Sequence, residues 1–378
     1  MADSQVCQQV RQHIMQMPLV DDHVHSCLAQ TPSRPRFEEL LCECAKPLGP
    51  GQSRFDSQAG FALVRYCSPL LFGERCAVAD YYDQRAGVDE ETADRTLLPA
   101  AGVGDWIIDP GWAATELIDS DEFARRCGGR VHLLTRLETV AEQLLQDAGA
   151  VHDFPQAFRR ALHEAAANNV GFKTICAYRC GFDIDWRKPS DTAVQQAVDA
   201  LDAHGRERLV DPQIVSFIVH EAMAFHKPIQ FHVGLGDRDI DFRHSNPLDL
   251  RDLLVAAENV GTPVVLLHCW PFERECGYLC QNFNNVYMDV GLASYLMGVQ
   301  AVDALRRALE LCPFTRLMYS SDAWGLPEQH YFGAMVFRRA FADLVEQWVA
   351  DGDWLPADAI RVADLVAAGN AKRLYRLS

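Results

Sequence analysis

Short apolar runs recur along the chain, and each ends in a polar or charged residue before a helical stretch begins. The runs are continuous rather than alternating, which is typical of strands buried on both faces of a parallel sheet. Eight strands are predicted on this basis, at 19–20, 106–108, 131–134, 172–177, 229–231, 264–267, 286–288 and 317–320.

The segments between these strands carry helix start signals, in which Asp, Asn or Leu stands one or two residues before a proline. Four helices are predicted in this way, at 153–167, 211–225, 246–258 and 326–348. Eight strands alternating with helices favour an α/β protein with a (β/α)8 TIM barrel. In such a barrel the chemistry is found at the carboxyl ends of the strands.

The interval between the first and second strands is much longer than one helix needs, at about 80 residues. The segment 34–100 is predicted to form several short helices, inserted after strand 1 over the barrel mouth as a lid. A structural decoration on the outside of the barrel is the alternative. In either case residues 1–378 are expected to form a single domain.

The charge balance narrows the range of partners. A formal net charge of -17 disfavours nucleic acid and anionic membranes, because both bind basic surfaces. No secretory signal and no membrane-spanning run is recognised, so a cytoplasmic enzyme acting on a small molecule is expected. The thirteen cysteines are then expected to be thiols. Pairs such as Cys42/Cys44 and Cys276/Cys280 lack the spacing of a zinc ribbon.

Candidate metal ligands stand at the ends of several strands. His23 and His25 are two residues apart at the end of strand 1, so both imidazoles can face one ion. His232 and His268 each end an apolar run that begins with a proline, and Asp322 follows strand 8. Because buried charge is unfavourable unless it is paired or bound to a metal, five such residues at matching depth predict a metal site.

These motifs resemble the amidohydrolase superfamily, and more closely the branch that also contains amino-carboxymuconate semialdehyde decarboxylase and related lyases. Within that branch the chain is similar to a subgroup whose plant and fungal members are fused to a glutamine-synthetase-like domain. The segments that carry this similarity are Phe172-Lys173-Thr174-Ile175, Ala177-Tyr178-Arg179, His232-Val233-Gly234-Leu235-Gly236-Asp237 and Tyr319-Ser320-Ser321-Asp322-Ala323.

The resemblance implies that His23, His25, His232 and Asp322 hold a metal ion. It also implies that Asp322 orients or deprotonates a water molecule, and that His268 acts as an acid or base or binds a second metal. Three imidazoles and a carboxylate suit Zn2+, although Mn2+ or Fe2+ would also be accepted.

Lys173 leaves the number of metal ions open. The run Asn169-Val170-Gly171-Phe172-Lys173 resembles the strand that carries a carboxylated, metal-bridging lysine in urease-like members. A bridging Lys173 would imply two metals, with His268 on the second. The alternative is an unmodified lysine that binds substrate or is ion-paired, and one metal is the default expectation.

Substrate recognition is assigned to residues that follow the predicted strands, namely Arg136, Arg179, Trp270 and Asp237. Arginine binds carboxylates with two parallel hydrogen bonds, so a small substrate that carries a carboxylate is expected. The predicted reaction is hydrolysis of an amide or other C–N bond by metal-activated water. A metal-dependent decarboxylase or lyase is the alternative, and a homo-oligomer is a further expectation.

Overall fold

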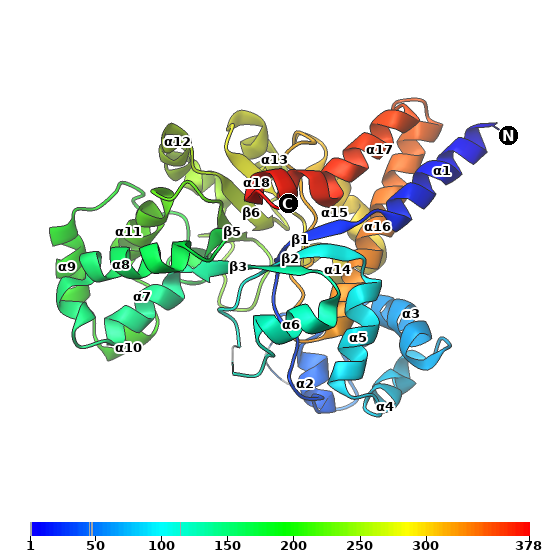
Figure 1. The fold of residues 1–378 in the computed structure, drawn as a ribbon, viewed down its shortest axis with the longest axis horizontal. Helices are drawn as coiled ribbons and strands as arrows, with labels where there is room; N and C mark the ends of the chain where they lie inside the picture. The colour runs from blue at the N-terminus through cyan, green and yellow to red at the C-terminus, as the bar shows by residue number, and fades with distance from the viewer. Residues whose placement is uncertain (1, 45, 47, 114) are drawn as a thin grey trace.

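The centre of the molecule is a curled sheet of seven parallel strands, each paired with the next in chain order (Figure 1). The computed structural model describes residues 2–44, 46, 48–113 and 115–378. The strands are β1 Leu19–Val24, β2 Val103–Ile108, β3 Arg130–Arg136, β4 Gly171–Thr174, β5 Ile229–Val233, β6 Val264–His268 and β7 Val286–Met288. This α/β arrangement is consistent with the predicted TIM barrel.

The two faces of the curled sheet belong to different parts of the core. A small hydrophobic cluster of buried residues contains Val20, Ile107 and Val265. Their neighbours on the same strands, such as Trp106 and Leu266, belong to the large cluster that includes the surrounding helices. Both faces are therefore buried, which is why the strands are continuous apolar runs.

The prediction of an eighth strand at 317–320 is wrong. The structure has irregular backbone over 317–323. This segment still bonds to both edges of the sheet. Met318 N donates to Met288 O of β7 at 2.9 Å, and Asp322 N donates to His23 O of β1 at 2.9 Å. The segment therefore occupies the position between β7 and β1 without forming a regular ladder.

The fourth strand is shorter than predicted. It ends at Thr174, and a 3-10 turn, Cys176–Tyr178, replaces its expected end. The side chains that follow Thr174 consequently leave the sheet and turn toward the ends of the neighbouring strands.

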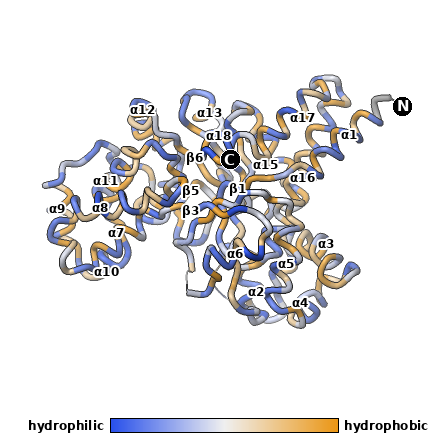
Figure 2. The backbone as a smooth tube through the Cα atoms, viewed as in Figure 1, coloured by the Kyte–Doolittle hydropathy of each residue, from blue (hydrophilic) through white to orange (hydrophobic). Residues whose placement is uncertain are grey.

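Helices follow the strands along the chain, and Figure 2 shows hydrophobic and hydrophilic residues alternating along many of them. Each buries one face against the sheet or another helix. After β2 they are α6 Ser120–Cys127, α7 Leu137–Gln146, α8 Phe154–Ala166, α9 Asp191–Ala200, α10 Ala203–Glu207, α11 Pro212–Met223, α12 Arg251–Val260, α13 Glu273–Asn282, α14 Ala293–Leu296, α15 Ala301–Ala308, α16 Pro327–Ala350, α17 Pro356–Asp364 and α18 Asn370–Tyr375.

The four predicted helices are present, with small shifts at their ends. Asp211 caps α11 as expected, because its side chain accepts hydrogen bonds from Gln213 N and Ile214 N. The helix expected from Asn246 begins instead as a 3-10 turn, Pro247–Leu250, and α12 follows directly. In the described part of the chain, no helix is long and apolar enough to cross a membrane.

The N-terminal helix α1 Ala2–Gln16 and the segment between β1 and β2 lie beside the long helix α16. That segment contains α2 Arg34–Glu39, α3 Gln58–Phe72, α4 Tyr81–Arg85 and α5 Glu90–Ala100. Helices α1, α3 and α5 all contact α16. Figure 1 places α2–α5 together, apart from the group α7–α11 on the other side of the sheet.

A buried ion network joins the segment between β1 and β2 to the rest of the protein. Arg85 Nε lies 2.6 Å from Glu328 Oε1 on α16, and Arg85 Nη2 lies 2.8 Å from Glu90 Oε2. All three side chains are at most 3% exposed. The segment is therefore attached to α16 by buried charge as well as by apolar packing.

Candidate metal centre and cavity

The carboxyl ends of the central strands bring together the histidines and the aspartate that the sequence singled out. His23 and His25 lie at the end of β1, and His268 ends β6. Asp322 is in the irregular segment 317–323, which lies between the edge strands β7 and β1 of the sheet. Asp322 is the centre of the group. Its Oδ1 lies 3.2 Å from His23 Nε2 and 3.6 Å from His25 Nε2, and its Oδ2 lies 3.4 Å from His268 Nε2.

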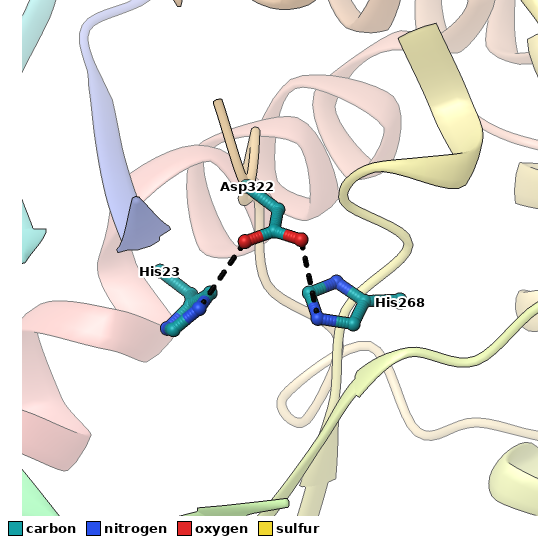
Figure 3. A group of neighbouring side chains, drawn as sticks. All are labelled: His23, His268 and Asp322. Atoms are coloured by element: carbon teal, nitrogen blue, oxygen red, sulfur yellow. Dashed lines mark ion pairs between the residues drawn. The ribbon is translucent and has the colours of Figure 1, made fainter. Parts of the chain in front are cut away.

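Figure 3 shows the Asp322 carboxylate between two imidazoles, with one oxygen directed to His23 and the other to His268. These three side chains form one compact group of possible metal ligands, and all three residues are buried. Asp322 and His268 both adopt positive φ, at 51° and 68°. Such backbone is strained for residues other than glycine and concentrates at functional sites.

The tautomers of the two β1 histidines are fixed by their neighbours. His23 Nδ1 donates to Gln230 Oε1 at 2.7 Å, and His25 Nδ1 donates to the Asp109 carbonyl oxygen at 2.7 Å. Each neutral ring therefore has its lone pair on Nε2, which faces Asp322. Burial lowers the pKa of His25 to about 4 and the pKa of His23 well below its ordinary value. Both rings are thus neutral, as metal ligands must be.

Among the described residues, His268 has no hydrogen bond at either ring nitrogen. Both nitrogens of the His268 ring are buried. Burial and the neighbouring His232 lower its pKa well below the ordinary value. A buried polar group without a partner is unfavourable, so a cation at this point would satisfy a nitrogen that is otherwise unsatisfied. The donor set therefore fits a divalent metal ion.

His268 is also held through its backbone. Asp289, just after β7, accepts hydrogen bonds through Oδ1 from His268 N and Gly291 N, both at 2.8 Å. These two hydrogen bonds stabilise the strained turn at the end of β6.

His232 was predicted to bind the same metal ion as His23. The two residues differ in which ring nitrogen makes a hydrogen bond. His232 Nε2 lies 2.9 Å from the Leu235 carbonyl oxygen, to which it donates, so the lone pair is on Nδ1. The ring lies next to His268, with centroids 4.5 Å apart. A side chain at Gly236 would clash with His232 Nε2 and the Tyr178 hydroxyl. The glycine therefore lets this loop close over both rings.

Lys173 lies at the floor of the site on β4. Its Nζ is 3.5 Å from His23 Nε2, and the residue is 2% exposed. Burial lowers the pKa of Lys173 to about 8, against the opposing effect of Asp322. Lys173 is therefore beside the group of ligands.

Arg136 lines the cavity and is paired with a buried carboxylate. Its Nε and Nη2 donate to Asp109 Oδ2 at 3.0 and 2.6 Å, and its Nη1 donates to Gly111 O at 3.0 Å. Burial alone would raise the pKa of Asp109, but Arg136 and the imidazoles outweigh it and hold that pKa below its ordinary value. Asp109 also forms a second group of possible ligands with His23 and His25.

A cavity of about 320 Å³ opens above these side chains. Of the residues predicted to bind substrate, Arg136, Arg179 and Asp237 line it. Arg179 is paired with Glu142 at 3.2 Å. Trp270 is absent from the described residues that line the cavity, and its ring faces Phe242 instead, with centroids 6.2 Å apart.

Among its described residues, the segment 34–100 reaches this cavity through its first part alone. Its lining residues come from α2 and the turn that follows, and they are Arg36, Glu39, Leu40, Cys42 and Glu43. Glu43 faces Asp322 and Asp237, and burial with their negative charge raises its pKa to about 8.

Two residues of the site were missed by the sequence reasoning. Gln230 was grouped with the apolar residues of its strand, and Asp109 was noted only as the residue that ends a strand. Both are fully buried polar groups. A polar residue inside an apolar run needs a partner, and that was the available signal.

Known proteins resemble this chain in sequence and in fold. The sequence model of the amidohydrolase family matches residues 224–377, which include His232, His268 and Asp322. Protein fluG of Emericella nidulans is 26% identical to the chain and aligns with 97% of it. The chain spans 46% of the length of that relative. A crystal structure from Lactobacillus casei ATCC 334, described as a candidate metal-dependent hydrolase, has a TM-score of 0.86 and 27% identity, with 97% of each chain covered.

The chain is thus similar to the amidohydrolase family over residues 224–377, and to a candidate metal-dependent hydrolase over 97% of its length. More distant structures share the fold alone. Glucuronate isomerase from Caulobacter crescentus has a TM-score of 0.69 and 14% identity, over 100% of this chain and 95% of its own. Uronate isomerase from Bacillus halodurans C-125 has a TM-score of 0.62 and 15% identity, over 100% and 97%. The family and its fold neighbours therefore include both hydrolases and isomerases.

Proposed function

We propose that this amidohydrolase-family protein is a metal-dependent hydrolase of an amide or other C–N bond in a small substrate. The observation that carries the proposal is the convergence of His23 Nε2 and His25 Nε2 on Asp322 Oδ1 at the wall of the cavity, with His268 Nε2 3.4 Å from Asp322 Oδ2.

His23, His25 and Asp322 would hold one metal ion, with His232 contributing through Nδ1. Zn2+ is the preferred ion, because imidazole nitrogens and a carboxylate oxygen are its ligands in hydrolases. Mn2+ or Fe2+ is the alternative. When bound, the metal would lower the pKa of a water molecule to about 7 and polarise the substrate carbonyl group.

The remaining steps are proton transfers by the chain's own residues. Asp322 Oδ2, the oxygen directed away from His23 and toward His268, would accept a proton from the attacking water. His268 Nε2, 3.4 Å from Asp322 Oδ2, would pass that proton to the leaving nitrogen. Lys173 is left as an unmodified lysine next to His23, and a carboxylated lysine with a second metal is the alternative.

Metal analysis of the purified protein, followed by product assays, tests the proposal. About one metal per chain is expected, and about two would favour the bridging role of Lys173. A panel of amides, aromatic acids and sugar acids would be assayed for released amine, released CO2 and isomerised product. Release of amine supports the proposal, whereas CO2 alone would indicate a lyase and isomerisation alone an isomerase.

Variants test the assigned residues. His23→Ala and Asp322→Asn are expected to lose activity by several orders of magnitude while circular dichroism shows a retained fold. Activity within about tenfold of the unmodified protein for either variant would rule out the assigned site.

A further inference from the structure

Cys42 and Cys44 form a pair of thiols beside the cavity that the proposed hydrolysis does not use. The thirteen cysteines all lie in the described part of the chain, and Cys44 is the exposed one among them. Cys42 is half-buried and lines the cavity. Cys44 is therefore an accessible thiol two residues from a thiol of the cavity wall.

The chain after α2 holds the backbone of Cys44 against the sulfur of Cys42. Cys44 N donates a hydrogen bond to Cys42 Sγ at 3.2 Å, which brings the backbone of one cysteine against the sulfur of the other. The guanidinium of Arg54 contacts Cys42 Sγ and also bonds the Lys46 carbonyl oxygen. A cation thus lies against the pair.

The environment of Cys44 favours its thiolate. The backbone at Lys46 and the neighbouring Arg54 guanidinium lower the pKa of Cys44 below its ordinary value, and the Cys44 thiol donates to the Lys46 carbonyl oxygen at 3.9 Å. Burial instead raises the pKa of most buried cysteines, for example Cys27 and Cys269. Because the thiolate is the nucleophile, reactivity is expected to concentrate at Cys44.

We propose that Cys42 and Cys44 are a redox-responsive dithiol at the cavity rim, with Cys44 the peroxide-reactive thiol and Cys42 the thiol that resolves it. The Cys44 sulfur attacks one oxygen of hydrogen peroxide. An S–O bond forms, the O–O bond breaks, and the hydroxide that leaves takes a proton to become water. The Cys42 sulfur then attacks the sulfenic acid, a disulfide forms, and a second water leaves with the Cys42 proton.

Two electrons pass from the thiols to the peroxide in this sequence. The disulfide would close around Glu43, the residue between the two cysteines, which lines the cavity and faces Asp322. Oxidation would therefore act on the cavity wall, whatever reaction the metal centre catalyses.

Alkylation locates the reactive thiol. The protein is treated with less than one equivalent of iodoacetamide at pH 7, digested with trypsin and analysed by mass spectrometry. Cleavage after Arg36 and Arg54 releases a peptide that contains Cys42 and Cys44 and no other cysteine. Most of the label is expected on Cys44. Label found mainly on another cysteine would overturn the proposal.

Oxidation tests the pairing of the two thiols. One equivalent of hydrogen peroxide should lower the mass of the same peptide by about 2 Da, as a disulfide requires. In Cys42→Ser the peptide should gain about 16 Da at Cys44, and in Cys44→Ser it should be unchanged. Cys76→Ser, a half-buried cysteine elsewhere, should behave like the unmodified protein. A peptide that keeps both thiols in the unmodified protein would overturn the proposal.

A third variant tests the role of the guanidinium. Arg54→Gln should slow alkylation of Cys44 at pH 7 by about threefold to tenfold, because less thiolate is present. The slowing should disappear at pH 10, where Cys44 is ionised in both proteins. An unchanged rate at pH 7 would show that Arg54 does not activate the thiol.

Discussion

Gln230 is predicted to set the affinity of the metal centre although it does not touch the proposed ion. Its Oε1 accepts the hydrogen bond of His23 Nδ1 at 2.7 Å. Its Nε2 donates to Asp22 O at 2.5 Å and to the Tyr375 hydroxyl at 2.8 Å. These two acceptors fix the amide so that the oxygen, and not the nitrogen, faces His23.

Gln230→Leu keeps the approximate volume and removes all three hydrogen bonds. His23 then loses the acceptor that keeps its lone pair on Nε2, and the loss of such outer partners weakens metal binding by about 10- to 100-fold. At about 1.4 kcal/mol per tenfold change, this is about 1.4–2.8 kcal/mol. Each buried polar group left without a partner would also lower the free energy of unfolding by about 1–3 kcal/mol.

Zn2+ affinity measured by competition with a chromophoric chelator, together with urea unfolding of the metal-free protein, separates the two effects. Tyr375→Phe is the matched control, because it removes only the bond on the far side of Gln230 and leaves His23 paired. It should change the Zn2+ dissociation constant by less than about threefold. The reasoning fails if Gln230→Leu also stays within threefold, or if both variants weaken Zn2+ binding equally.

Two further predictions concern stability away from the metal centre. Arg85→Met leaves the buried Glu328 without its cation and should lower the free energy of unfolding by about 3–5 kcal/mol, whereas Arg95→Met, which breaks an exposed pair, should lower it by less than about 1 kcal/mol. Equal losses in the two urea titrations would contradict the role of burial. Burial alone would raise the pKa of Glu221, but hydrogen bonds from Arg159 at 2.9 and 3.1 Å help to lower it below its ordinary value of 4.5. The ionised Glu221 therefore stabilises the fold above pH 4.5, and this stabilisation is lost as the pH falls through the lowered pKa. Glu221→Gln should accordingly lose less stability than the unmodified protein between pH 5 and pH 3, and an identical loss would count against the pairing.

Much of the architecture is determined by the sequence alone. Continuous apolar runs such as those at 229–231 and 264–267, alternating with helical stretches, favour parallel strands buried on both faces, so most of the sheet could be predicted from pattern. The carboxyl ends of parallel strands meet at one edge of a sheet. For that reason the convergence of His23, His268 and Asp322 could be predicted before their distances were known.

Other features depend on contacts between residues that are far apart in the chain. The pattern at 317–320 predicts a strand, but Asp322 bonds His23 O through a backbone at positive φ, which a regular ladder does not allow. Arg136 has the same sequence signal as a substrate-binding arginine. Only the tertiary structure places Asp109 within 2.6 Å of its guanidinium, which removes it from the free charges of the cavity.

The histidines show most clearly the difference between what the sequence predicts and what tertiary contacts decide. Their positions at strand ends are a property of the local pattern, because the period of a strand decides which side chains share a face. Which nitrogen carries the lone pair is decided by Gln230 for His23 and by Leu235 for His232, through hydrogen bonds that no local pattern specifies. The sequence thus determined which residue types meet at the barrel rim, and the tertiary structure decided the orientation and protonation of each.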